Sequence, residues 1–147
     1  MVIREATVRD LDELVEMENL FKNPFTKIQV LYEILKNPTS KFLVACDDKK
    51  PSLIFGFIDF WITFDSATIC QLAVKKEYQN MGIASKLLEE SFKILKENKV
   101  LFYTLEVREH NEKAINLYKK HGFTYVTLKE QYYSDGENAI YMMKGIL

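Results

Sequence analysis

The segment from Ile69 to Leu88 constrains this chain more than any other part of it, because it reads as a buried strand, a turn and an amphipathic helix in succession. Gly82 lies in the turn, directly before the apolar residues of the helix. The first backbone N–H groups of a helix have no partner inside it, and the helix dipole adds about half a positive charge at this end. A glycine also lets a ligand come close to the backbone. The segment therefore predicts an anion-binding site, and the expected ligand is a phosphate or a pyrophosphate.

Two common phosphate-binding loops do not match this segment. It has neither the G-x-x-x-x-G-K-S/T pattern of P-loop proteins nor the G-x-G-x-x-G fingerprint of dinucleotide-binding folds. A helix that begins near a glycine by chance is the alternative to an anion site. The context favours the site, because the helix carries small and apolar residues at helical spacing: Ile83, Leu87, Leu88, Ser91, Ile94 and Leu95.

Strand and helix patterns alternate along the chain, with no repeat, linker or low-complexity segment between them. We expect strands over residues 2–6, 42–46, 53–63, 67–74, 100–107, 123–129 and 139–144. We expect helices over residues 7–19, from Thr26 to Asn37, from Gly82 to Asn98, and over 111–120. This order predicts an α/β fold with a mixed sheet, in which the strands flanking the Gly82 helix are neighbours joined by a right-handed crossover. A length of 147 residues predicts a single domain over 1–147.

Composition narrows the classes of function. The net charge is −1, which gives no argument for binding nucleic acid or a membrane surface. The sequence shows no signal peptide and no apolar run long enough for a bilayer, so we expect a cytoplasmic protein. Cys46 and Cys70 fall in expected strands, where we expect them to be reduced and in the interior. With only two histidines, His110 and His121, the chain has no convincing zinc site, and we expect no metal.

Two segments together resemble one protein family. The run Gln79-Asn80-Met81-Gly82-Ile83-Ala84 resembles the acetyl-coenzyme A pyrophosphate motif of the GNAT superfamily of N-acetyltransferases. The segment from Leu105 to Phe123 is similar to the strand and helix that follow in that superfamily, and most similar to those of its RimI-type branch, the ribosomal-protein-alanine N-acetyltransferases. The resemblance covers nearly the whole chain. It implies a mixed sheet of about seven strands with about four helices, in which the central strands splay apart around the pantetheine arm of acetyl-CoA.

The resemblance implies acetyl-CoA as a cosubstrate. Backbone amides after Gln79 would bind the pyrophosphate, and main-chain groups of the preceding strand would bind the pantetheine. The implied cofactor residues are Leu72, Val74, Gln79, Met81, Gly82, Ile83, Ala84, Asn111 and Tyr118. Asn111 is also a natural N-cap for the helix that follows it. His110 stands where the family usually has a small residue, often serine, and we assign it no role.

Acetyl transfer from a thioester to an amine needs a neutral amine, hydrogen-bond donors for the oxyanion and a proton for the leaving thiolate. The resemblance gives Tyr118 the role of the acid, near the sulfur of coenzyme A; a tyrosine packed on one face of an amphipathic helix is the alternative. It gives Glu106, in a Leu-Glu-Val-Arg run, the role of the base, acting directly or through water. A surface ion pair on a strand is the alternative for Glu106. Strand alternation places Glu106 and Arg108 on the face opposite Leu105 and Val107.

The acceptor amine follows less directly from the sequence. An α-amino group titrates near ~7.7–8.0 and a lysine near ~10.4, so keeping the amine neutral at pH 7 costs about 1 and about 4.6 kcal/mol respectively. A single glutamate suits the first amine better. Tyr132 and Tyr133 resemble the paired tyrosines with which N-terminal acetyltransferases hold the first residues of a substrate, and Phe25 matches the other wall of that groove. Aromatic residues at the end of a strand are the alternative.

We therefore expect an enzyme that transfers acetyl from acetyl-CoA to a protein N-terminal α-amine by direct attack in a ternary complex. Ribosomal protein S18 is the best-known substrate of the branch. The alternatives are a GNAT acetyltransferase of a small amine such as a polyamine, and a non-catalytic acyl-CoA-binding regulatory protein. The expected partners are acetyl-CoA and a peptide or protein N-terminus, without nucleic acid or membrane. The expected assembly is a monomer or a weak homodimer.

Overall fold

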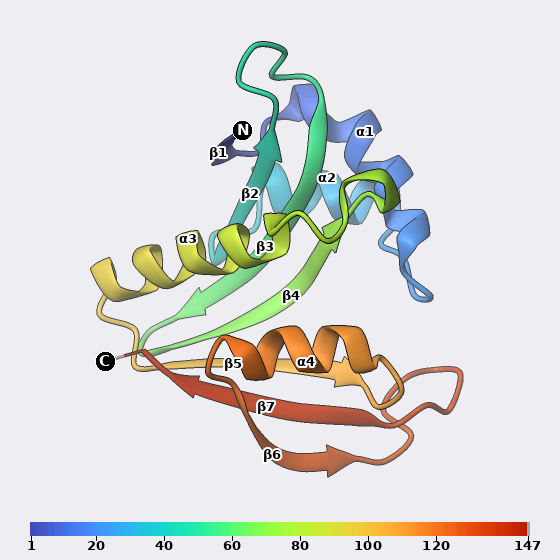
Figure 1. Cartoon of the computed structure of the whole chain (residues 1–147), viewed down its shortest axis with the longest axis vertical. Coiled ribbons are helices and arrows are strands. Elements are labelled where there is room, and N and C mark those ends of the chain that lie inside the picture. Colours follow the sequence, from blue (N-terminus) through green and yellow to red (C-terminus); the bar gives the residue numbers. More distant parts are fainter. Residues whose placement is uncertain (147) are drawn as a thin grey trace. The chain divides into compact units, whose positions relative to one another are not determined.

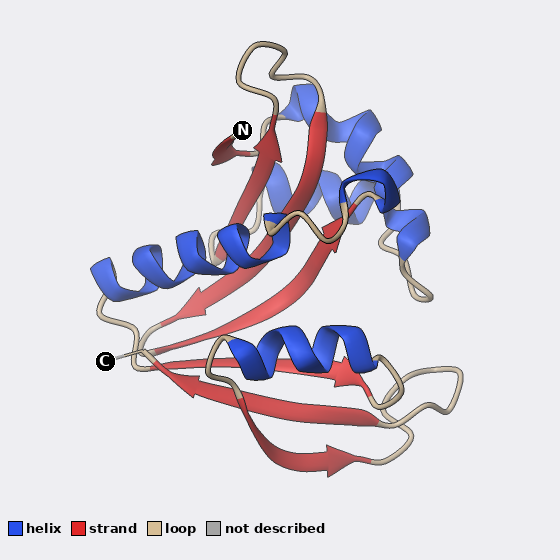
Figure 2. Cartoon of the chain, in the orientation of Figure 1, coloured by secondary structure: helices blue, strands red, loops and turns tan. Residues whose placement is uncertain are grey.

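The structure is a computed structural model that describes residues 1–146 (Figure 1). Figure 2 shows the same ribbon coloured by type of element. The main elements, in chain order, are β1 Val2–Glu5, α1 Leu11–Met17, α2 Lys27–Leu35, β2 Ser40–Cys46, β3 Ile54–Thr63, β4 Ser66–Val74, α3 Ile83–Glu97, β5 Phe102–Arg108, α4 Glu112–Lys120, β6 Thr124–Lys129 and β7 Ala139–Gly145. Short 3₁₀ helices are η1 Val8–Asp10, η2 Glu18–Leu20 and η3 Lys76–Tyr78.

The strands form one mixed sheet in the order β1-β2-β3-β4-β5-β7-β6, which confirms the predicted fold class. β4 and β5, the strands that flank α3, are parallel neighbours, whereas β1–β2, β2–β3, β5–β7 and β6–β7 are antiparallel. The β4–β5 pairs run from Ser66↔Phe102 to Ile69↔Leu105, although β4 continues to Val74 and β5 to Arg108.

Most element boundaries differ from the predicted ones by only one or two residues, and the first helix differs most. The helix expected over residues 7–19 is α-helical only over Leu11–Met17, with a 3₁₀ turn at each end. Its start is fixed by Asp10, whose carboxylate accepts hydrogen bonds from the Thr7 backbone N–H (2.8 Å) and from the Arg4 guanidinium (2.8 Å). The short helix η3 was not predicted, because three residues are too few to show a helical period.

The chain divides into two compact units. The first contains Met1–Trp61 and Cys70–Ser91, and the second contains Ile62–Ile69 and the chain from Phe92 onward. The single domain expected over 1–147 therefore stays a prediction. Within residues 1–146, no helix has both the length and the apolar character needed to cross a bilayer.

The core of the first unit lies between the strands β2 and β3 and the helices α1 and α2 (Figure 1). Phe42 and Phe57 stack there with 5.2 Å between ring centroids, and Cys46 is buried beside them as a free thiol. α2 begins at a reciprocal cap: the Gln29 backbone N–H donates to Thr26 Oγ1 (3.2 Å), and the Thr26 N–H donates to Gln29 Oε1 (2.7 Å). The buried core residues are Leu14, Met17, Val30, Phe42, Val44, Cys46, Ile54, Phe57 and Ala73.

The second unit is organised by β5, along which exposed and buried side chains alternate. Tyr103 points to the buried face and contacts Phe92 edge-on (5.9 Å between ring centroids) and Phe123 (5.5 Å). Phe123 follows Gly122, which ends α4 with a φ of +94°, in the left-handed region that favours glycine. The Phe123 backbone N–H returns to the Tyr118 carbonyl (3.0 Å), so α4 and the aromatic core are fixed together.

Two acids are buried against each other in the first unit. Asp59 on β3 is 0% exposed and Glu33 on α2 is 6% exposed. Ser40 Oγ donates to Asp59 Oδ1 (2.8 Å), Trp61 Nε1 donates to Glu33 Oε1, and Asn37 Nδ2 donates to Glu33 Oε2 (2.7 Å). Within residues 1–146, Asp59 Oδ2 has no hydrogen-bond partner. Burial, followed by the hydrogen bond and charge of Glu33, raises the pKa of Asp59 to about 9, so this carboxyl is protonated at neutral pH.

The raised pKa of Asp59 predicts that the folded protein becomes less stable as the pH rises. The pKa of an Asp in the unfolded chain is near 3.8 and that of the folded Asp59 is about 9, so the native state holds one more proton throughout that window. The free energy of unfolding should therefore decrease between these two pH values, by at most about 1.4 kcal/mol per pH unit. Asp59→Asn keeps an acceptor for Ser40 and adds a donor for Glu33, and it removes the titrating group. We expect its melting temperature to exceed that of the parent at pH 8, with a gap that narrows toward pH 4.

Thermal unfolding followed by circular dichroism across pH 4–9 measures this gap. Asp12→Asn is the matched control, because the Asp12 side chain is 96% exposed. A constant difference between Asp59→Asn and the parent at every pH would contradict a raised pKa of Asp59 in the folded protein.

Candidate active site

The predicted anion site lies in the first unit, where the chain leaves β4 and turns into α3. The Gln79 side-chain amide donates to the Val74 carbonyl (3.0 Å), which ties the turn to the end of the strand. Asn80 and Gly82 have φ values of +64° and +81°, so the backbone reverses twice in the left-handed region before α3 begins at Ile83. A side chain at Gly82 would meet no heavy atom within 4 Å, so the space above this backbone is open. The geometry leaves the amides at the start of α3 accessible to an anion.

Half-buried and buried side chains alternate along the strand before this turn. Leu72 and Val74 are half-buried, whereas Gln71 and Ala73 are buried. The neighbouring strand β3 comes close because of Gly56, where a Cβ atom would lie 2.7 Å from the Ala73 carbonyl oxygen. The main chain of β4 is therefore held tightly from the side of β3, a constraint that the sequence analysis missed.

The loop that carries Phe25 is held by a buried acid that the sequence analysis also missed. Glu18 is 2% exposed, and its Oε1 accepts hydrogen bonds from the Phe25 backbone N–H (2.7 Å) and from Gln71 Nε2 (2.8 Å). Burial raises the pKa of Glu18 above its ordinary value. This contact connects the half-buried Phe25 to β4, so the loop before α2 has one defined position relative to the strand.

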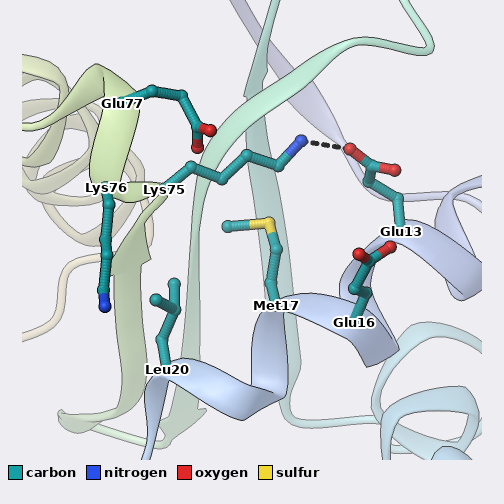
Figure 3. Close-up of a pocket in the computed structure, with 7 residues that line it drawn as sticks. All are labelled: Glu13, Glu16, Met17, Leu20, Lys75, Lys76 and Glu77. Atoms are coloured by element: carbon teal, nitrogen blue, oxygen red, sulfur yellow. Dashed lines mark hydrogen bonds and ion pairs between the residues drawn. The ribbon is translucent and has the colours of Figure 1, made fainter.

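A cavity of ≈ 460 Å³ opens beside these elements in the first unit (Figure 3). Met17 and Leu20 form its apolar part, and an ion pair between Lys75 and Glu13 crosses it. The complete lining is Glu13, Glu16, Met17, Leu20, Lys75, Lys76 and Glu77. None of the predicted site residues lines this cavity, and its mixed charges single out no ligand.

One group of possible metal ligands comes together within residues 1–146. Ligand atoms of Glu33, Asp59 and Cys70 lie within 4.8 Å of one another. Both oxygens of Glu33 and one of Asp59 already accept hydrogen bonds, and the raised pKa of Asp59 keeps its carboxyl protonated at neutral pH. A protonated carboxyl is a poor metal ligand, so we place no metal there.

In the second unit, Glu106 lies on the face of β5 that carries the half-buried side chains. Its Oε1 accepts a hydrogen bond from Lys129 Nζ, 2.7 Å away at the end of β6. Lys129 Nζ also lies 4.5 Å from the ring centroid of Tyr141 and 5.3 Å from that of Tyr132. The hydrogen bond and charge of Glu106 raise the pKa of Lys129, which keeps this side chain an ammonium.

Arg108 occupies the next position on the same face and holds the loop of the paired tyrosines. Its guanidinium contacts the carboxylates of Asp135 (2.9 Å) and Glu137 (2.8 Å) and lies 4.0 Å from the ring centroid of Tyr133. Tyr132 and Tyr133 meet edge-on, with 5.0 Å between ring centroids. Glu106 therefore does form an ion pair, as its alternative role expects, with Lys129 of β6, and its role as the base stays a prediction.

Tyr118 lies on the opposite side of β5 from Glu106. It is 8% exposed, contacts Phe123 edge-on (5.7 Å between ring centroids), and so belongs to the aromatic group around Tyr103 on the buried face. Burial raises the pKa of the Tyr118 phenol well above its ordinary value, so it keeps its proton at neutral pH. Asn111 caps the same helix as predicted, since its Oδ1 accepts from the Ala114 backbone N–H (3.2 Å).

The structure therefore gathers the predicted site residues into two groups, one in each unit. The first unit holds Phe25, Leu72, Val74, Gln79, Met81, Gly82, Ile83 and Ala84, and the second holds Glu106, Asn111, Tyr118, Tyr132 and Tyr133. The roles of these residues stay predictions. His110, to which no role was assigned, is exposed, and its backbone N–H donates to Glu137 Oε2 (3.2 Å).

Known proteins place this chain in one family. The model of the Acetyltransferase (GNAT) family matches residues 8–123. A Bacillus subtilis (strain 168) protein, provisionally named as a ribosomal protein bS18-alanine N-acetyltransferase, is 33% identical over 142 residues, which cover 95% of this chain and 92% of that protein. An N-alpha-acetyltransferase of Sulfurisphaera tokodaii is 34% identical over 151 residues, covering 95% of this chain and 90% of that one.

A solved structure gives the same assignment. The crystal structure of the ribosomal-protein-S18-alanine N-acetyltransferase from Escherichia coli matches with a TM-score of 0.87 at 28% identity, covering 99% of this chain and 93% of that chain. The family model spans most of the sequence, including the turn at Gly82 and the helix of Tyr118. The chain therefore belongs to the GNAT family of acetyltransferases and is an acetyl-CoA-dependent N-acetyltransferase.

Proposed function

We propose that this enzyme acetylates the α-amine of a peptide or protein N-terminus. The observation that carries the proposal is the single face of the second unit on which Glu106, Arg108 and the paired tyrosines lie. Arg108 holds Tyr133 and its loop through Asp135 and Glu137, so the tyrosines are fixed beside the strand that presents Glu106. A face that carries one carboxylate and two aromatic rings suits the end of a peptide, which offers one amine and a main chain.

The proposed reaction is a direct attack. The α-amine nitrogen attacks the thioester carbonyl carbon, and the bond from that carbon to sulfur breaks. The proton of the amine passes to Glu106, directly or through water, and the leaving thiolate takes a hydrogen bond or a proton from Tyr118. Because burial raises the pKa of Tyr118, hydrogen-bond donation to the developing thiolate is the larger part of this role.

We propose that acetyl-CoA binds with its pyrophosphate at the amides of Met81, Gly82, Ile83 and Ala84 and its pantetheine along Leu72 and Val74. The left-handed turn at Asn80 and Gly82 and the open space at Gly82 support this placement. Gln79 would hold the turn, and Asn111 would contact the cofactor arm while it caps α4.

The names of the relatives support an N-terminal acceptor. One is provisionally named for the alanine of ribosomal protein bS18, and another is named as an N-alpha-acetyltransferase. We propose a protein N-terminus as the acceptor class, with ribosomal protein S18 as the first candidate to test. Acetylation of a polyamine is the competing activity, and the test below distinguishes it from the proposal.

Tyr118→Phe removes one hydroxyl and leaves the edge-on contact with Phe123 in place. The turnover rate at saturating substrates should fall by about 10²-fold or more, because the thiolate loses its donor. The dissociation constant for acetyl-CoA, measured by calorimetry, should hardly change. Tyr125→Phe, at an exposed position of β6, is the matched control. A Tyr118→Phe enzyme with the parental turnover rate would rule out the proposed role.

The acceptor class is tested with two short peptides. One has a free N-terminal alanine and no lysine, and the other has a blocked N-terminus and an internal lysine. We expect a single acetyl group at the α-amine of the first peptide and a far slower reaction of the second, read by mass spectrometry. Glu106→Gln should lower the rate most at low pH, where less of the amine is already neutral, whereas the exposed Glu130→Gln should not. Preference for the lysine peptide, or for spermidine over both peptides, would overturn the N-terminal proposal.

A further inference from the structure

Lys129 lies in a cage whose three walls all attract an ammonium group. The Glu106 carboxylate forms one wall, at 2.7 Å from Nζ. The rings of Tyr141 and Tyr132 form the other two, with centroids 4.5 Å and 5.3 Å from the same atom. Aromatic faces and a carboxylate are the groups with which proteins bind organic ammonium ions. The chain's own lysine therefore fills a site with the chemistry of an amine-binding pocket.

The sheet register produces this cage. Glu106 is paired with Tyr141 across β5 and β7, so the two side chains project from the same face. Lys129 is paired with Ala139, two residues from Tyr141 on β7, which places Lys129 on that face as well. Tyr132 comes from the loop after β6 and lies over the ammonium. Three strand positions and one loop residue therefore fix Nζ beside Glu106.

The ammonium of Lys129 neutralises the charge of the Glu106 carboxylate, and the neighbouring cation, Arg108, is paired with other carboxylates. The side chains of Lys129 and Glu106 are 37% and 21% exposed, so the pair is partly shielded from water. Arg108, the next residue on the face of β5, pairs with Asp135 and Glu137. An acceptor that approaches Glu106 therefore meets a carboxylate that is already neutralised by a fixed ammonium group.

We propose that Lys129 is a specificity-determining residue, which fills the ammonium cage beside Glu106 and so makes the acceptor site reject amines that carry a second cation. This inference rests on the proposed function, because it takes Glu106 as the group that serves the acceptor amine. Lys129 hardly lowers the affinity of a peptide α-amine that is flanked by neutral residues, since this amine can enter the site in its neutral form. A polyamine, whose amines are cationic, meets like charge where it would otherwise find the cage.

The alternative role for Lys129 is purely structural, as one half of an ion pair that ties β6 to β5. The two roles differ in what they change. Loss of a structural pair would lower stability and slow every acceptor alike. Loss of a selectivity group would change the ratio between acceptors, because Glu106 and the neighbouring rings could then attract an ammonium group of the acceptor.

The test compares kcat/KM for spermidine and for the free N-terminal alanine peptide in the parent, Lys129→Met and Lys129→Arg. Met keeps the length of the side chain without its charge, and Arg keeps the charge. We expect the spermidine-to-peptide ratio to rise about ten-fold or more in Lys129→Met, because the like-charge repulsion is removed and the Glu106 carboxylate loses the ammonium that neutralises it. The ratio should stay close to the parental value in Lys129→Arg.

The outcomes separate this inference from the proposed function. A parent that prefers the peptide, with the same ratio in Lys129→Met, would overturn the inference and leave the proposed function intact. A parent that prefers spermidine would overturn the proposed function itself. A Lys129→Met enzyme that melts at the parental temperature but is equally inactive on both acceptors would also contradict the inference, since Lys129 would then be required for turnover and not for selection. The same gain in ratio in Lys129→Arg as in Lys129→Met would contradict it too, because charge would not be the cause.

Discussion

The alternation of side chains along β5 is the constraint on which the chemistry of the second unit depends. Leu105 and Val107 point into the core, and Glu106 and Arg108 point to the other face. The core face carries the aromatic group that packs Tyr118, and the other face carries Glu106 with the paired tyrosines. A shift of one residue in the register of β5 would exchange these faces, and with them the proposed acid and the proposed base. The seven paired positions between β5 and β7, from Phe102↔Gly145 to Arg108↔Ala139, hold the register.

In the first unit, hydrogen bonds to buried carboxylates connect elements that are far apart in the sequence. Glu18 connects the Phe25 loop to β4, and Glu33 connects α2 to β3 through Trp61. Each of these acids is nearly inaccessible to water, and burying a charged carboxylate is costly unless it is hydrogen-bonded or protonated. Asp59 is protonated at neutral pH, and Glu18 is hydrogen-bonded. These hydrogen bonds reduce the cost of burial and also fix the loop of Phe25 relative to β4.

Local features of the site could be read from the sequence, and contacts between distant segments could not. The turn from Gln79 to Ala84 and the cap at Asn111 are set by residues within one or two turns of each other, so the sequence alone predicts them. The faces of β5 follow from a period of two. In contrast, Gln71 and Glu18 are 53 residues apart, and their hydrogen bond has no local signal.

The cage around Lys129 depends on two separate strand registers, β5–β7 and β6–β7, and no single segment reveals it. The loss of α-helical geometry at both ends of α1 also escaped prediction. It follows from tertiary contacts of Asp10 and Glu18, which take over the ends of the helix.

The most direct test of the central claim is the affinity of two conjugates, each joining coenzyme A through an acetyl bridge to the same short peptide. In one the bridge is attached to the α-amine, and in the other it is attached to the ε-amine of a lysine, with the N-terminus blocked. Calorimetry should show the α-linked conjugate binding about 10²-fold or more tightly than the ε-linked one, because only the first resembles the state in which both substrates react. Equal affinity, or tighter binding of the ε-linked conjugate, would contradict an N-terminal α-amine as the acceptor.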